Sequence, residues 1–86
     1  MTVNGLAFSS DASMLAAVGG GGQGGIWNAK TGLQARTLKR LPASAGIVRF
    51  SRDGKQLIVI GTDGIVEVLE TATGEQAAQF SVKPVN

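Results

Sequence analysis

The stretch that decides the fold is residues 47–70, IVRFSRDGKQLIVIGTDGIVEVLE. In this stretch, three apolar runs are separated by turns that contain Asp53-Gly54 and Asp63-Gly64. An Asp-Gly pair between apolar runs favours a tight β-hairpin, because glycine accepts the positive φ that such a turn needs. The stretch therefore predicts three short antiparallel strands, at residues 47–50, 56–60 and 65–69. A Thr-Gly turn at residues 73–74 leads into a fourth expected strand, at about residues 76–82.

The same pattern occurs 42 residues earlier in the chain, without a gap. When the two copies are aligned, identical residues occupy equivalent positions: Phe8-Ser9 and Phe50-Ser51, Asp11 and Asp53, Leu15 and Leu57, Gly19 and Gly61, Thr31-Gly32 and Thr73-Gly74. The strands expected in the first copy are residues 5–8, 14–18, 25–28 and 33–38. Pro42 and Pro84 follow the fourth strand of each copy, where the chain must leave the ladder of hydrogen bonds.

The length of the repeat indicates four-stranded blades of a propeller, which recur at about 40–45 residues, rather than helical repeats. The composition agrees, because a chain with 13 glycines and many β-branched residues is a poor helix former. We therefore expect an all-β chain of two four-stranded antiparallel blades. The first blade takes residues 1–42, and residues 43–86 hold the second blade and a C-terminal tail, the two forming one structural unit.

The residues at these turns resemble those of WD-repeat β-propellers. Residues 50–57, followed by residues 61–64, match the family's Phe-Ser-x-Asp-Gly turn and its second hairpin. Trp27 lies where the family's Trp-Asp dipeptide falls, and the Thr-Gly turns at 31–32 and 73–74 match its next turn. The resemblance covers nearly the whole chain. It implies propeller blades, whose loops commonly bind a protein or a peptide.

The chain also departs from the family's pattern. The Gly-His dipeptide before the first strand is replaced by Arg40-Leu41 and Val82-Lys83, and Leu69-Glu70 stands in place of the second Trp-Asp. The family's buried tetrad of hydrogen-bonding side chains needs a histidine, which this chain lacks. We therefore expect Trp27 to be a core anchor and Asp63 a turn residue.

A glycine-rich run, residues 19–25, contains a G-x-G-x-x-G match at Gly20, Gly22 and Gly25. A dinucleotide site of this kind needs a helix after the glycines, whose N-terminus holds the pyrophosphate. Here a strand and a turn follow, so the sequence predicts a loose hairpin between the second and third strands. No cofactor is expected.

The composition excludes several kinds of chemistry. Without histidine or cysteine there is no zinc site of the usual kind and no serine or cysteine triad, so we expect no catalytic or metal-binding residues and no enzyme. The net charge is +2, but no basic stripe with aromatic platforms indicates nucleic-acid binding. No apolar run approaches the ~20 residues that span a bilayer. No segment has the basic start and apolar core of a signal peptide, so none is expected. These features predict a soluble, cytoplasmic chain.

The apolar runs in the second strand of each copy indicate that both faces of each sheet are covered. In the fourth strands, apolar and polar residues alternate more clearly, as expected of edge strands that water partly reaches. Blade packing and the contact between subunits are thus expected to use apolar residues of the inner strands. These candidates are Leu6, Phe8, Leu15, Trp27, Val48, Phe50, Leu57, Val59, Val68 and Leu69.

Two blades cannot close a propeller, and the uncovered faces would leave apolar patches that soluble monomers rarely show. We therefore expect copies of the chain to close into a ring, with the second blade of one copy against the first blade of the next. Four chains and eight blades is the favoured ring, and three chains and six blades the second. Arg49 lies on the strand expected nearest the ring axis, where a solvated or ion-paired side chain is the expected role and contact with an anion in the channel is the alternative.

Three classes of function follow from this pattern. The first is a self-assembling structural module without catalytic activity, as a natural fragment or an engineered unit. The second is an interaction platform that binds a protein or peptide through loops such as residues 40–44. The third, an enzyme, has little support in the residues present.

Overall fold

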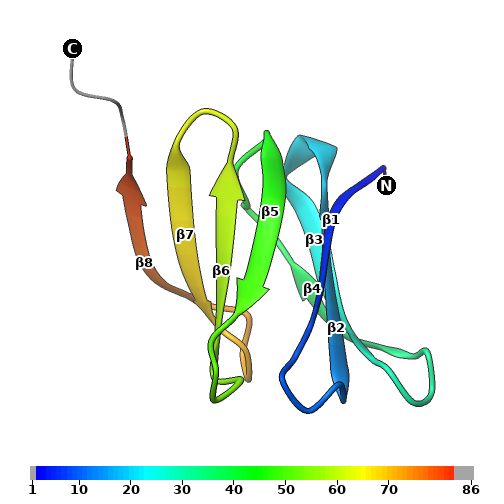
Figure 1. The fold of residues 1–86 in the computed structure, drawn as a ribbon. Coiled ribbons are helices and arrows are strands. Elements are labelled where there is room, and N and C mark those ends of the chain that lie inside the picture. Colours follow the sequence, from blue (N-terminus) through cyan, green and yellow to red (C-terminus); the bar gives the residue numbers. More distant parts are fainter. Residues whose placement is uncertain (1, 83–86) are drawn as a thin grey trace.

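The computed structural model describes residues 2–82, which form two four-stranded antiparallel sheets (Figure 1). Each sheet is a meander, in which every strand pairs with the next strand along the chain. The first sheet consists of β1 (Val3–Phe8), β2 (Met14–Gly19), β3 (Gln23–Asn28) and β4 (Gln34–Leu38). The second consists of β5 (Ala45–Phe50), β6 (Gln56–Gly61), β7 (Ile65–Glu70) and β8 (Gln76–Ser81). The all-β prediction with two four-stranded antiparallel sheets is confirmed; the residues expected after the last strand, including Pro84, lie outside the described part.

Both β1 and β5 begin two residues earlier than expected. In each strand the register shifts at one residue, Asn4 in β1 and Gly46 in β5, so that a bulge extends the pairing toward the N-terminus. The two bulges lie at equivalent positions of the repeat. A bulge of one residue leaves no clear alternation signal in a sequence, which explains why the sequence predicts these strand starts two residues late.

The glycine-rich run forms a hairpin between β2 and β3, as expected, but a compact one. Residues Gly20–Gly22 make a single 3₁₀ turn, and β3 already begins at Gln23. Gly22 has φ +77°, and a Cβ there would lie 2.8 Å from the carbonyl oxygen of Leu41. A glycine at this position therefore lets the chain that links the blades approach the turn.

The linker between the blades holds both neighbouring turns at one end of the molecule. The Gly21 N–H donates to the Ala43 carbonyl (3.2 Å), and the Thr62 N–H donates to the Ser44 carbonyl (3.1 Å). Leu41 from the linker is buried in the core. The linker therefore fixes one blade relative to the other rather than acting as a free hinge.

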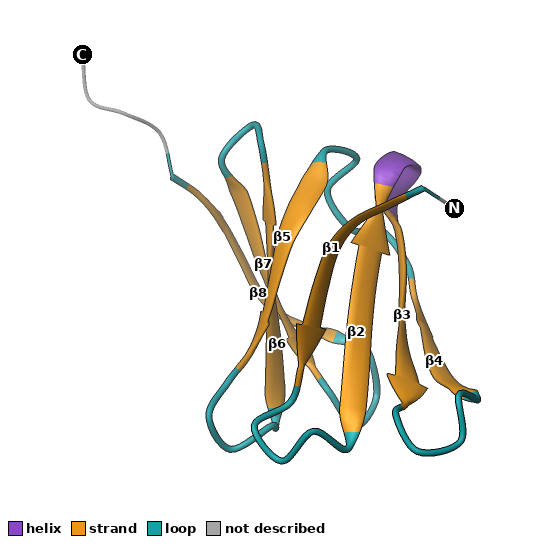
Figure 2. Ribbon diagram, turned by 45° about the vertical axis from the view of Figure 1, so that its right-hand side comes forward, coloured by secondary structure: helices purple, strands orange, loops and turns teal. Residues whose placement is uncertain are grey.

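The blades pack face to face, with β5 beside β1 and β2 (Figure 2). The core between them is formed by Ala16, Val18, Ile26, Leu38, Leu41, Ala45, Val48, Leu57, Val59 and Leu69. No helix among the described residues is long and apolar enough to cross a membrane.

Equivalent aspartates close the turns after β1 and β5. Asp11 Oδ1 accepts hydrogen bonds from the Ser13 N–H (3.0 Å), the Ser13 hydroxyl (2.7 Å) and the Ser9 hydroxyl (2.8 Å). These bonds, the Ser13 N–H first, lower the pKa of Asp11 to about 2. Asp53 accepts from Ser51 and the Lys55 N–H in the same way, and its pKa is also lowered. Both aspartates are therefore turn residues whose ionised form the turn stabilises.

One of these two turns carries backbone strain that a substitution removes. Ala12 has φ +62°, at the repeat position where Gly54 has φ +74°. A residue with a Cβ pays about 1 kcal/mol or more in this left-handed region. We expect Ala12→Gly to raise the free energy of unfolding by about 1 kcal/mol, measured by urea denaturation.

Gly54→Ala is the matched control for this prediction. An added Cβ would meet only the end of Met14, at 3.9 Å, so its effect comes from the backbone alone. It is expected to lower the free energy of unfolding by about 1 kcal/mol. If the two changes shifted stability in the same direction, the left-handed strain at Ala12 would not be the cause.

Candidate functional site

The candidate site is the pair of sheet faces that the blades do not use against each other. In an antiparallel ladder, directly opposite residues share a face, so the pairing of Val48 with Val59 and of Leu57 with Leu69 defines the inner face of the second blade. The pairing of Ala16 with Ile26 marks the inner face of the first blade. The two inner faces pack against each other, and this contact is the joint between the blades. The remaining two faces, the outer faces, point away from the joint.

The outer face of the first blade is apolar and open. Leu6 is 58% exposed and Phe8 61% exposed, while Leu15 and Trp27 beside them are half-buried. A groove of about 430 Å³ runs over this face. Its lining consists of Val3, Phe8, Leu15, Ala17, Trp27 and the turn residues Asn28, Ala29 and Gly32.

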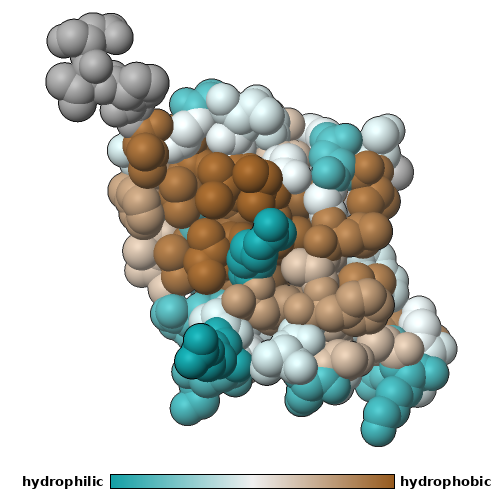
Figure 3. Space-filling model, viewed as in Figure 1, coloured by the Kyte–Doolittle hydropathy of each residue, from teal (hydrophilic) through white to brown (hydrophobic). Residues whose placement is uncertain are grey.

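The outer face of the second blade is also apolar, and Figure 3 shows it as a broad hydrophobic area over that sheet. Phe80 is 52% exposed and Ile47 46% exposed. Ile58, Ile60 and Val68 lie half-buried on the same face. Figure 1 shows that this sheet has no other strand in front of it.

The structure places the ten residues that the sequence predicts for packing in three locations: the joint between the blades, the first outer face and the second outer face. Val48, Phe50, Leu57, Val59 and Leu69 lie in the joint between the blades. Leu6, Phe8, Leu15 and Trp27 lie together on the first outer face, and Val68 lies on the second. Sequence reasoning missed further apolar residues of these faces, although their place in the 42-residue repeat would have identified several of them, among them Ala16, Val18, Ile26, Leu38, Ile58, Ile60 and Phe80.

Arg49 is exposed on β5, on the same face as Ile47, and its Nη1 donates to the Val48 carbonyl at 2.9 Å. Its repeat equivalent in the first blade is Ala7, which packs partly buried against the core. The contact with an anion in a channel stays a prediction.

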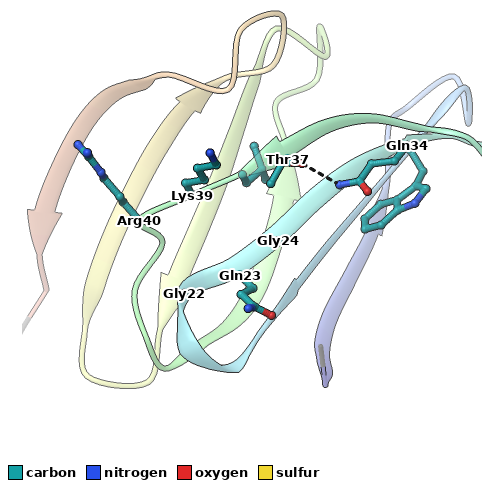
Figure 4. A pocket seen from close by; sticks show the side chains of 9 residues that line it. Gly22, Gln23, Gly24, Gln34, Thr37, Lys39 and Arg40 are labelled. Atoms are coloured by element: carbon teal, nitrogen blue, oxygen red, sulfur yellow. Dashed lines mark hydrogen bonds between the residues drawn. The ribbon is translucent and has the colours of Figure 1, made fainter.

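A second hollow, of about 540 Å³, lies beside β3 and β4 on the first blade (Figure 4). Gln34 Nε2 donates to the Thr37 hydroxyl (3.3 Å) and the Arg36 carbonyl (3.0 Å). A Cβ on Gly25 would come within 2.9 Å of the Trp27 ring, so glycine there lets the indole lie along the strand. This packing presents the other side of the indole as part of the first outer face.

A buried carboxylate lies between the two blades. Glu67 on β7 is only 2% exposed, and burial raises its pKa. It lines a groove of about 330 Å³ with Lys39 and Arg40 from the first blade and Glu75 from the turn before β8. Among the described residues, no group of three or more acids is placed to hold a metal ion.

Burial of Glu67 predicts a dependence of stability on pH. A pKa raised by folding means that the folded chain binds the proton more tightly, so stability falls as the pH rises through that pKa. We expect Glu67→Gln to be more stable than the parent chain at pH 7, with the difference shrinking as the pH falls through the raised pKa and vanishing below the ordinary carboxyl pKa. Urea midpoints measured between about pH 4 and about pH 8 test this.

Glu75→Gln is the control, because Glu75 lines the same groove but is exposed. Its urea midpoint is expected to follow that of the parent chain across the same pH range. A Glu67→Gln chain less stable than the parent at pH 7 would show that the carboxylate has a stabilising partner.

Comparison with known proteins agrees with the architecture. No protein-family model matches the chain. A WD repeat-containing protein, JIP5 of Phaeosphaeria nodorum, is 46% identical over 44 residues, which are 51% of this chain and 10% of that protein.

The solved β-propeller domain of Cps50 (Swd1) from Myceliophteria thermophila superposes with a TM-score of 0.85 at 20% identity. The superposition covers 94% of this chain and 26% of that one, so the likeness is one of fold. The chain thus spans only a minor part of either relative. The resemblance seen in the turn residues is confirmed: the chain is similar to WD-repeat β-propeller blades in sequence over half of its length and in fold over nearly all of it.

Proposed function

We propose that the chain is a non-catalytic assembly module whose copies complete a closed propeller. The observation that carries the proposal is the match between each outer face and a face that already packs. The 42-residue repeat relates the inner face of the first blade to the outer face of the second, and the inner face of the second to the outer face of the first. Each outer face therefore has the same pattern of apolar positions as a face that already packs in the joint between the blades.

Individual pairs make this match concrete. Leu38 is 2% exposed in the joint, whereas its equivalent Phe80 is 52% exposed on the second outer face. Val48 is fully buried, whereas its equivalent Leu6 is 58% exposed on the first outer face. Docking the second outer face of one copy on the first outer face of another would cover both residues as the joint covers Leu38 and Val48.

Such a contact is heterologous, because two different faces meet. A heterologous contact forms a ring when its rotation closes, and otherwise an open filament. Repeated propeller joints favour closure, and with two blades from each chain the ring holds an even number of blades. Four chains with eight blades is the ring we propose, with three chains and six blades second.

Native mass spectrometry tests the proposal. We expect a single species of four times the chain mass, and a species of three times that mass would support the smaller ring. A chain that keeps the mass of one copy at micromolar concentration would contradict assembly. A broad series of growing masses would contradict closure.

A second candidate, a protein- or peptide-binding platform, is favoured by one observation in the linker. Arg40 is exposed and has φ +60°, and strained non-glycine residues of this kind cluster at ligand-binding segments. If the linker binds a protein, substitutions at residues 40–44 should abolish capture of that partner while the mass of the ring stays unchanged. Capture that survives every such change would exclude this form of the platform.

A further inference from the structure

The groove between the two blades of one chain has a feature that packing alone does not explain. Glu67 lies in it at 2% exposure, and among the described residues its carboxylate has no hydrogen-bond or ion-pair partner. A buried carboxylate is ordinarily paired, because removing a charge from water without compensation is costly. The first blade has Gly25 at the equivalent position, so the carboxylate occurs once in each chain.

The charges around Glu67 have two signs and come from different blades. Lys39 and Arg40 follow β4 of the first blade, and Figure 4 shows both side chains directed away from Gln23, toward the strands of the second blade. Glu75 and Gln76 line the groove from the second blade. The groove therefore has an acidic group that water barely reaches and two basic groups that are exposed to solvent.

We propose that this groove binds a free amino acid, whose ammonium group pairs with Glu67 and whose carboxylate pairs with Lys39 and Arg40. Its volume of about 330 Å³ is at the small end of the range for ligand pockets, which suits a ligand of this size. The ammonium supplies the positive charge that the buried carboxylate lacks. The two cations remain free for the other end of the ligand, because neither forms an ion pair with Glu67 in the described part of the chain.

Binding of L-alanine, followed by ¹H–¹⁵N NMR, tests the proposal. We expect saturable shifts at the amides of Glu67 and Lys39, with one site in each chain. Ethylamine carries the ammonium without the carboxylate, and propionate carries the carboxylate without the ammonium. Each is expected to bind about tenfold more weakly than L-alanine, because it makes only half of the contacts.

Three variants separate the proposed contacts. Glu67→Gln should weaken L-alanine binding about tenfold, and its fold is secure because it removes a buried charge. The double change Lys39→Gln and Arg40→Gln should weaken L-alanine binding but leave ethylamine binding unchanged. Glu70→Gln is the control and should change the affinity by no more than about twofold, because Glu70 is exposed and does not line this groove.

The proposal is overturned if L-alanine gives no saturable shift, if Glu67→Gln binds it as the parent does, or if ethylamine binds as tightly as L-alanine. The groove lies within one chain, so the titration can be repeated on a chain whose outer faces are blocked. Binding that persists there would stand even if no ring forms, and a ring without binding would leave the assembly proposal intact.

Discussion

Two chains that are each blocked on a different outer face are expected to form a dimer when mixed, although each alone stays monomeric. Leu6→Glu places a carboxylate in the first outer face, and Phe80→Glu places one in the second. Both residues are more than half exposed in the single chain, so both variants should fold. In a docked face the same carboxylate would be buried without a partner, which costs about 3 kcal/mol or more and lowers the association constant more than about a hundredfold.

The mixture distinguishes a heterologous contact from a symmetric one. The Leu6→Glu chain keeps a good second face, and the Phe80→Glu chain keeps a good first face. One contact between them is therefore intact, and no third chain can add to the pair. Native mass spectrometry should show one species of twice the chain mass. If the outer faces paired like with like, each single variant would dimerise by itself, and that result would refute the proposed head-to-tail order.

Local turn chemistry explains why the strands could be predicted from sequence. Gly54, Gly64 and Gly74 all have positive φ in the structure, as the hairpin pattern requires. These constraints act over a few residues and do not depend on the rest of the fold. The bulges at Asn4 and Gly46 follow instead from how β1 and β5 pair, and sequence alone did not indicate them.

The candidate site was only partly accessible from sequence. The apolar runs of β2 and β6 indicated that both faces are covered, but they did not tell which face meets the other blade of the same chain. That choice depends on where the linker at Leu41 holds the blades. Glu67 had no evident partner in the sequence, and its burial depends on the same packing, because the groove brings it beside Lys39 and Arg40, which are distant from it along the chain.

The leucines at two equivalent positions of the repeat, Leu57 and Leu15, are expected to serve two different processes, folding of the chain and assembly of the ring. Leu57 is fully buried in the joint, whereas Leu15 is half-buried on the first outer face. Leu57→Ala leaves a cavity in the joint and should lower the free energy of unfolding by about 3 kcal/mol. This is a large part of the about 4–13 kcal/mol expected for a chain of this length.

Leu15→Ala is the matched change on the outer face. In the Phe80→Glu background, which cannot assemble, it should lower the free energy of unfolding by about 1 kcal/mol or less, measured by urea denaturation. In the otherwise unchanged chain it should weaken association by about 2 kcal/mol, because Leu15 would then be buried as Leu57 is. Equal losses of folding stability at the two positions would mean that the first outer face is already covered within one chain. A loss at Leu57 alone, with association intact in Leu15→Ala, would mean that the ring contact lies elsewhere.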